Sequence, residues 1–534
     1  MAACWFWSGC GSQNTKKDAP LEAHRPVSGG TLVIGTPTDI AGVNQLGPRV
    51  HSFTQTVLNR LFLHLVEERP DHKDHPPTFG PQIATDWEWS DDHLVLELKL
   101  RDDLVWSDGK PITAEDVVWT WTAQTSPDIS WENAFSKENI VSIEAIDRHS
   151  LRVTYTRAND AQLYDLNEGV ILPKHAWSQL PFDQWSERGD WFVDHLVVSG
   201  PFVLEDWQRQ QQIILARNDK YFAKNLPYLE RVIFRIVPQS LNRIGQLLSG
   251  ELDFVGNLPV SEVASTTQTN RFNIKKYWAS RYDFVCWNLA KPLFSDPETR
   301  RALTMAIDRQ TLIDALWFGH ARIATSPIPS SIWAHAREIQ PWPYDPDTAR
   351  EILAGRGWSD TDGDGVIDSD GRPFAFDLLI NAAAQISVDA GVMIQEQFRR
   401  IGIEANVSRI EFGSLAAKVS EHDFDAFVGG WSIDTSLDLS YAFHTDAITG
   451  ALNFGSFTNP QVDRLIDASE REPDTALRGE MLREIQAILH HEQPYTFLWE
   501  PQRLVGVSTQ VRGAEPNSMD GLYRIESWWM IPEN

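Results

Sequence analysis

The chain has 534 residues, 42% of them apolar and 23% charged, which is the composition of a globular protein with about three or four domain-sized units. The 74 acidic and 47 basic residues give a formal charge of −27; such a chain repels phosphate backbones, so we exclude nucleic acid as a partner. Three cysteines without metal-binding spacing argue against a zinc site, and no apolar run reaches the roughly 18 residues of a membrane-spanning helix.

The amino terminus is expected to be a lipid-anchored tether. Small residues precede Cys10 in the segment Trp-Ser-Gly-Cys at 7–10, as in a bacterial lipobox, whose cysteine carries diacylglycerol. The following residues are polar, which suits a flexible tether. No Lys or Arg precedes this cysteine, and the apolar run is shorter than the roughly 7–15 residues of the apolar region in a signal peptide. We therefore expect a signal remnant and tether over 1–29, lipidated at Cys10, with an ordinary disordered terminus as the alternative.

The first regular elements are predicted from apolar periodicity and capping residues. Residues 30–35 and 94–100 are expected to be strands, the second with leucines at every other position on one face. Thr113 is an expected helix N-cap with acidic residues in the first turn. Asp296-Pro297 opens another helix, with apolar residues at helical spacing as far as Ile313.

A βαβ unit is predicted in the second half of the chain. Residues 374–380 alternate as a strand, 388–401 have helical periodicity, Gly402 ends the helix, and 403–407 alternate again. A strand, a helix and a strand within about 35 residues favour a parallel pair. The fold class is therefore expected to be α/β.

Several segments together resemble the family 5 extracytoplasmic solute-binding proteins of ABC transporters, the dipeptide and oligopeptide type. Their order and their spread from about residue 30 to 510 match the family. They are 106–118 (WSDGKPITAEDVV), 199–202 (SGPF), 217–222 (RNDKYF), 250–253 (GELD), 294–296 (FSD) with 300–303 (RRAL) and 306–309 (AIDR), and 453–454 (NF) with 462–463 (VD).

The resemblance implies a periplasmic-binding-protein-like α/β fold of type II, cluster C, with two lobes, a hinge and an inserted extra domain. It places the first lobe at 30–60, 197–286 and 497–534, the inserted domain at 61–196, and the second lobe at 287–496. Crossings near 286 and 497 would form the hinge, and closure over a ligand would be a rigid-body motion of the lobes.

The candidate ligand site lies at 427–434, where a strand runs into two glycines, an aromatic residue and an acid. Gly430 would let a ligand approach the backbone, and Trp431 would stack on it or pack in the core. In peptide-binding relatives an acid just after this tryptophan pairs with the ligand's α-ammonium group, and Asp434 occupies that position. The alternative role of Asp434 is to cap a turn. Asp438 is a further candidate, although relatives often have proline after such an aspartate and leucine follows here.

An acidic loop at 360–371 has the spacing of a calcium-binding EF-hand loop, with glycine at position 6. Position 12 is Gly371 in place of the bidentate glutamate, and the alternative is a solvated acidic loop. The expected role of Ca²⁺ here is structural. The candidate ligands are Asp360, Asp362, Asp364, the carbonyl of Val366, Asp368 and Asp370.

The expected function is that of a substrate-binding lipoprotein, held by its lipid anchor in the periplasm or cell envelope, which delivers a peptide to an ABC permease. The alternatives are an oligosaccharide ligand, favoured by 22 tryptophans, a nickel chelate, or a sensory or chaperone-like binding protein without a permease. The sequence contains no P-loop, GxGxxG, GxSxG or HExxH motif, so we expect no catalytic residues, no required cofactor and no enzymatic activity. We expect a monomer.

Overall fold

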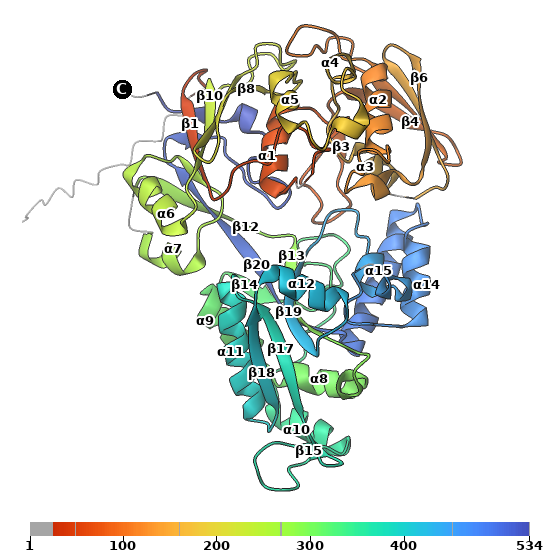
Figure 1. Ribbon diagram of the computed structural model, residues 1–534, viewed down its shortest axis with the longest axis vertical. Coiled ribbons are helices and arrows are strands. Elements are labelled where there is room, and N and C mark those ends of the chain that lie inside the picture. The colour runs from red at the N-terminus through yellow and green to blue at the C-terminus, as the bar shows by residue number, and fades with distance from the viewer. Residues whose placement is uncertain (1–24, 49, 160, 267–269, 451, 533–534) are drawn as a thin grey trace, which may run out of the picture.

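The computed structural model shows two lobes, one above the other in Figure 1, joined by the long strand β20 (Tyr495–Ser508). The upper part contains the first lobe and the inserted domain, and the lower part is the second lobe. This agrees with the two-lobed α/β class that the sequence predicts. The structure describes residues 25–48, 50–159, 161–266, 270–450 and 452–532.

One sheet continues through both lobes. Within the described residues it has twelve strands in the order β18-β17-β19-β13-β20-β11-β1-β10-β9-β8, with β12 and β14 also paired to β20. The first half of β20 pairs with β13 and β14 of the second lobe, and its second half pairs with β11 and β12 of the first lobe. The sheet is thus the mechanical link between the lobes.

The strand pairing places the hinge close to the two expected crossings. Strands β12 and β13 follow one another antiparallel to β20. β12 pairs with β20 as far as Trp278, β13 pairs also with second-lobe strand β19 from Arg281 onward, and on β20 the pairing passes from β14 to β12 between Pro501 and Gln502. Crossings near 286 and 497 were expected from the sequence. Because β13 is already paired with second-lobe strand β19 from Arg281 onward, the observed crossings lie a few residues closer to the first lobe.

The first lobe is organised around β1, which pairs in parallel with β10 and β11 and confirms the strand predicted at 30–35. Its elements are β1 (Thr31–Thr36), α1 (Ser52–Leu61), β8 (Phe202–Gln208), β9 (Gln212–Arg217), β10 (Arg231–Ile236), α6 (Ser240–Ser249), β11 (Phe254–Val255), α7 (Val260–Thr266), β12 (Phe272–Trp278), β21 (Val511–Arg512), η5 (Ile525–Ser527) and β22 (Trp529–Met530).

The inserted domain has a four-stranded antiparallel sheet in the order β4-β5-β7-β6. Leu96, Leu98 and Leu100 are buried on one face of β5, as predicted, and Thr113 N–H donates to Asp116 at 2.9 Å at the start of α2. Its apolar residues share one core with the first lobe. The elements are β2 (Val66–Glu68), β3 (Phe79–Pro81), β4 (Ala84–Trp89), β5 (Val95–Leu100), α2 (Ala114–Gln124), η1 (Ala134–Lys137), β6 (Ile140–Asp147), β7 (Ser150–Tyr155), α3 (Gln162–Asn167), α4 (Lys174–Trp177), η2 (Phe182–Gln184) and α5 (Gly189–Asp194).

The second lobe buries both faces of its sheet. Along β13, Val285 and Trp287 belong to one hydrophobic cluster, whereas Phe284 and Cys286 belong to another, as the period of two in a strand requires. Its elements are β13 (Arg281–Trp287), η3 (Pro292–Phe294), α8 (Pro297–Met305), α9 (Arg309–Trp317), β14 (Ala321–Ile323), α10 (Pro346–Gly355), β15 (Asp368–Ser369), β16 (Arg372–Pro373), β17 (Ala375–Asn381), α11 (Gln385–Arg399), β18 (Glu404–Ile410), α12 (Phe412–Ser420), β19 (Ala426–Ser432), α13 (Ser440–Phe443), η4 (Thr445–Ile448), α14 (Pro460–Ser469) and α15 (Thr475–Glu492).

The predicted βαβ unit is present as β17, α11 and β18, with the two strands parallel. Gly402 has φ +79°, the left-handed conformation that ends α11 without steric cost. The helical spacing from Pro297 to Ile313 belongs to two helices, however, and the prediction of one helix was wrong. Asp308 accepts a hydrogen bond from Thr311 N–H at 3.0 Å and so caps a second helix, α9.

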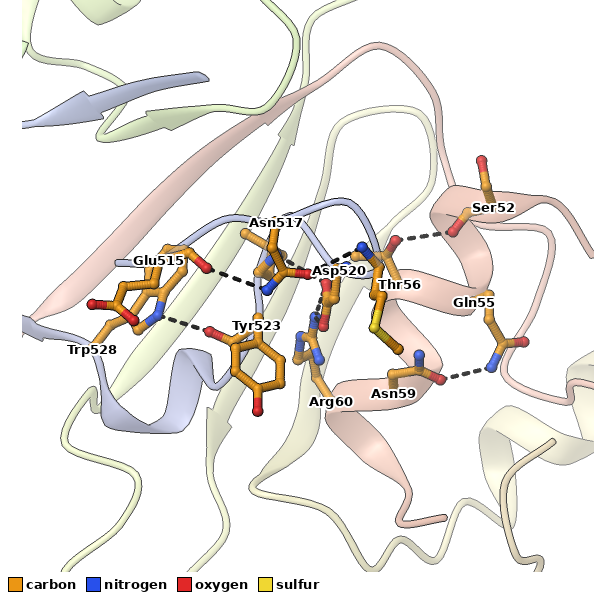
Figure 2. Close-up of polar contacts among 12 residues, drawn as sticks. Ser52, Gln55, Thr56, Asn59, Arg60, Glu515, Asn517, Asp520, Tyr523 and Trp528 are labelled. Carbon is orange, nitrogen blue, oxygen red and sulfur yellow. Dashed lines mark hydrogen bonds and ion pairs between the residues drawn. The ribbon is translucent and has the colours of Figure 1, made fainter. Parts of the chain in front are cut away.

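The carboxyl-terminal segment is bound to helix α1 of the first lobe (Figure 2). Asp520 lies between Arg60 of α1 and its own loop, which it caps by accepting a hydrogen bond from Leu522 N–H. The guanidinium group of Arg60 donates to Asp520 at 2.6 Å, and only 7% of the arginine side chain and 23% of the aspartate side chain are exposed. Trp528 Nε1–H donates to the carbonyl of Tyr523 and fixes the next turn of the segment.

Candidate ligand-binding site

A cavity of about 430 Å³ lies between the inserted domain and the second lobe. The inserted domain contributes η1 and α3, and the second lobe contributes the segment 434–440, which directly follows β19. In Figure 1 the helices α3, α14 and α15 lie around this boundary. Its lining residues are Asn133, Phe135, Ser136, Glu138, Asn139, Arg157, Asn159, Ala161, Tyr164, Asp165, Glu168, Asp434, Ser436, Asp438, Ser440, Glu470 and Arg478.

Asp434 caps a turn and lies on the cavity wall. Its Oδ1 accepts hydrogen bonds from the N–H and the hydroxyl of Ser436, so the side chain caps a turn, and it also lines the cavity. The surrounding protein raises the pKa of Asp434, chiefly by desolvation, although the side chain keeps contact with the solvent of the cavity. Asp438 also lines the cavity and caps α13 by accepting from Ser440 N–H at 2.7 Å.

Trp431 lies beside the cavity and not in its lining. Its ring is half-buried against the aromatic side chains of Tyr441 and Phe454, with centroids 5.2 and 6.1 Å away. It therefore packs at the rim of a second-lobe core.

The structure shows a steric reason for glycine at position 430. A Cβ atom there would lie 2.0 Å from Oδ1 of Asp283 and 2.2 Å from the guanidinium group of Arg281, which form an ion pair on neighbouring strand β13. Asp283 is only 8% exposed, and Trp499 Nε1–H donates to it at 2.7 Å. Glycine makes room here for a buried ion pair, and the backbone face toward β13 is closed to a ligand.

The other edge of β19 has a short partner. Strand β17 pairs with it only at Ala426 and Phe427, whereas β13 follows it as far as Ser432. Among the described strands, none pairs with residues 428–432 on the side opposite β13. A stretch of strand edge thus leads up to the segment that carries Asp434.

The opposite wall was not predicted from the sequence. Tyr164, Asp165 and Glu168 belong to α3 and the turn after it, about 270 residues before Asp434 in the chain, and no motif marks them. Behind them Lys137 is 2% exposed and donates hydrogen bonds to the carbonyls of Asp165, Leu166 and Glu168. Burial lowers the pKa of Lys137 to about 8.

The lobes are in contact around the cavity. The residues on the upper side all belong to the inserted domain, so closure brings this domain, and not only the first lobe, onto the second lobe. The contacts are Trp333 N–H donating to the carbonyl of His72 at 2.9 Å, the ion pairs Arg337–Asp74 at 2.8 Å and Arg157–Glu470 at 3.8 Å, and the Thr435 hydroxyl donating to Glu68.

Two half-buried acids predict a pH dependence of the ligand-free protein. Burial is the main cause that raises the pKa of Glu68 from 4.5 to about 7 and that of Asp165 from 3.8 to about 7. At a pH between the ordinary pKa and the raised pKa of each acid, the folded state binds more protons than the unfolded state. The free energy of unfolding therefore falls as pH rises toward 7. We expect the Tm to decrease between pH 5 and 7.5 more steeply in the parent than in the Glu68→Gln/Asp165→Asn variant. Identical slopes in a thermal-shift assay would contradict these pKa values.

A continuous strand between two lobes, with a cavity at their boundary, defines a solute-binding protein of the periplasmic type. The chain matches the family described as bacterial extracellular solute-binding proteins, family 5 Middle, over residues 78–450, and it belongs to that family. Its family consists of binding proteins and not of enzymes. In the part of the chain that the structure describes, no helix is long and apolar enough to cross a membrane.

The chain is similar to several peptide-binding members of the family. It is 29% identical to the oligopeptide-binding protein AppA of Bacillus subtilis, covering 99% of this chain and 97% of that protein. It is 25% identical to a probable D,D-dipeptide-binding periplasmic protein, DdpA of Escherichia coli, over 93% of both. The structure of Bacillus subtilis AppA in complex with a nonapeptide has a TM-score of 0.78 and covers 95% of this chain and 100% of that chain. NikZ from Campylobacter jejuni, solved with Ni(L-His), shares the fold at 22% identity, with a TM-score of 0.78 over 93% of this chain and 99% of that chain.

Proposed function

We propose that this protein is the substrate-binding component of an ABC transporter, which captures a peptide between its lobes and delivers it to a membrane permease. The observation that carries the proposal is the strand edge of β19 at 428–432, which Asp434 follows two residues later on the wall of the interlobe cavity. An extended peptide added to that edge would make main-chain hydrogen bonds whatever its sequence. Its α-ammonium group would then meet the Asp434 carboxylate in a charge-assisted hydrogen bond.

Part of the tryptophan excess that favoured an oligosaccharide ligand belongs to the protein cores. Among the described residues, several tryptophans are fully buried in the cores and unavailable for stacking on sugar rings. They are Trp106, Trp177, Trp185, Trp287, Trp499 and Trp528. This observation supports the peptide over the carbohydrate.

The proposal is tested by calorimetric titration with an unmodified peptide, the same peptide with an acetylated amino terminus, a cello-oligosaccharide and a nickel–histidine chelate. The unmodified peptide is expected to bind and to raise the Tm, because a ligand of the folded state stabilises it. Acetylation removes the ammonium charge and should weaken binding. Binding of the sugar or the chelate without binding of any peptide would overturn the proposal.

We also propose that the mature protein is monomeric, is exported and is anchored to a bacterial membrane through Cys10. This residue lies outside the described part of the chain. The support is its sequence context and the extracellular family to which the chain belongs. Metabolic labelling with palmitate should mark the parent and not a Cys10→Ser variant, and equal labelling would rule out the anchor.

We propose a structural Ca²⁺ in the loop 360–371, at the end of the second lobe far from the cavity (Figure 1, near β15). Carboxylate oxygens of Asp360, Asp362 and Asp368 all lie within 4.8 Å of one another. Asp364 is not part of this group and accepts a hydrogen bond from Val366 N–H. Asp370 and the glycine after it have φ +52° and +69° and form the turn between β15 and β16, which accounts for Asp370 without a metal.

Removal of calcium is expected to lower the Tm of the protein, because the gathered carboxylates then repel one another. The measurement is a thermal shift with EDTA and with added Ca²⁺. An Asp362→Asn variant should lose most of the response, whereas Asp370→Asn should keep it. A Tm that neither EDTA nor Ca²⁺ changes would exclude the site.

A further inference from the structure

The interlobe cavity has an excess of negative charge. Among the residues that the structure describes, six carboxyl groups line it, against two guanidinium groups. Three carboxylates come from the inserted domain and three from the second lobe, so like charges face one another across the cavity. The carboxylates are those of Glu138, Asp165 and Glu168 on one side and of Asp434, Asp438 and Glu470 on the other.

The basic groups nearby compensate only part of this charge. Arg157 pairs with Glu470 at 3.8 Å, and Arg478 donates to the carbonyl of Ser436. Lys137 lies behind the wall, where its ammonium group is occupied by backbone carbonyls. With Lys137 included, the described residues here comprise six carboxyl groups and three basic groups.

The carboxylates influence one another across the lobe boundary. Asp434 and Asp438 of the second lobe both contribute to the raised pKa of Asp165, and Glu168 of the inserted domain contributes to the raised pKa of Asp434. Bringing these walls together without a counter-charge is unfavourable, because partial desolvation strengthens the repulsion. A cation placed between them would remove this cost.

We propose that the cavity selects an organic cation, namely the basic side chain of a peptide with lysine or arginine near its amino terminus. The inference rests on the proposed function, since it assigns one charge of the ligand to Asp434 and a second charge to the remaining carboxylates. A volume of about 430 Å³ is large enough for an extended lysine or arginine side chain. The amide of Asn133 donates to the Glu168 carboxylate at 2.7 Å and holds this acid on the inserted-domain wall.

The test compares three peptides of one length and sequence that differ at a single position near the amino terminus, which is lysine, norleucine or glutamate. Titration calorimetry at physiological salt is expected to give about 10- to 100-fold tighter binding of the lysine peptide than of the norleucine peptide, the range for a hydrogen bond between charged groups. The glutamate peptide should bind most weakly. In a Glu168→Gln/Asp438→Asn variant the lysine-to-norleucine ratio should fall toward one, whereas the exposed-site control Glu480→Gln should keep it.

The outcomes separate this inference from the proposed function. Equal binding of all three peptides, or a ratio unchanged in the double variant, would overturn the cation selectivity and leave peptide capture intact. Binding of spermidine without binding of any peptide would support an organic-cation site and overturn both the peptide source and the proposed function. Binding of neither spermidine nor the lysine peptide would overturn the inference.

Discussion

Replacement of Asp434 by asparagine is expected to weaken peptide binding by about 2–3 kcal/mol, or roughly 30- to 150-fold in Kd. The carboxylate faces the interlobe cavity, and the variant leaves the peptide's ammonium group without its counter-charge in a partly desolvated place. Asparagine keeps an oxygen that accepts the hydrogen bonds of Ser436, so the turn should persist. The Tm of the ligand-free variant should stay equal or rise, because a carboxylate with a raised pKa has been removed.

A double-mutant cycle assigns the lost affinity to the ammonium group. The parent and Asp434→Asn should bind an amino-terminally acetylated peptide about equally, since that peptide has no charge for the carboxylate to meet. Asp446→Asn serves as the matched control, because the Asp446 side chain is 93% exposed and lies outside the cavity lining. An equal loss of affinity for the free and the acetylated peptide in Asp434→Asn would refute the assigned pairing.

The second large effect is expected in the first lobe. Replacement of Arg60 by alanine should reduce the free energy of unfolding by about 3 kcal/mol, the lower end of the range for breaking a buried ion pair. The variant leaves the Asp520 carboxylate without its cation between α1 and the carboxyl-terminal segment (Figure 2). Urea denaturation followed by tryptophan fluorescence measures the change, since Trp528 lies in the same segment.

An exposed pair of the same chemistry is the control. Arg350 pairs with Asp347 on the surface of α10, with 48% and 85% of the two side chains exposed, and exposed pairs contribute about 0–1 kcal/mol. The Arg350→Ala variant should therefore unfold almost as the parent does. Similar losses in the two variants would mean that burial does not determine the strength of these pairs.

The helices and strands that could be predicted from the sequence are those whose pattern lies within a short stretch of residues. The βαβ unit was predictable because strand alternation, helical periodicity and Gly402 lie within about 35 residues and agree with one another. The division into α8 and α9 was missed because the apolar spacing continues across the break, and only Asp308 marks the new start. The crossing between the lobes was predicted near residue 286 from a boundary between sequence segments. In the structure the pairing changes at 278–281, and this position depends on which strands pair with one another.

Only one wall of the candidate site had a sequence signal. Asp434 and Asp438 follow a recognisable strand-and-tryptophan segment, so they were singled out, and both line the cavity. Asp165 and Glu168 belong to a short helix and the turn after it in another domain, and they come next to Asp434 only where the two domains meet. The steric reason for Gly430 could not be predicted, since the ion pair on the adjacent strand is invisible until the register is known.

Strand β20 has a consequence for how the molecule is made. Residues 495–508 supply one strand to the sheet in both lobes, and they follow all the other strands of that sheet in the chain. Most multidomain chains complete their amino-terminal domain first during synthesis. Here neither lobe can complete its part of the sheet before residues 495–508 have been synthesised, so the two lobes become complete together.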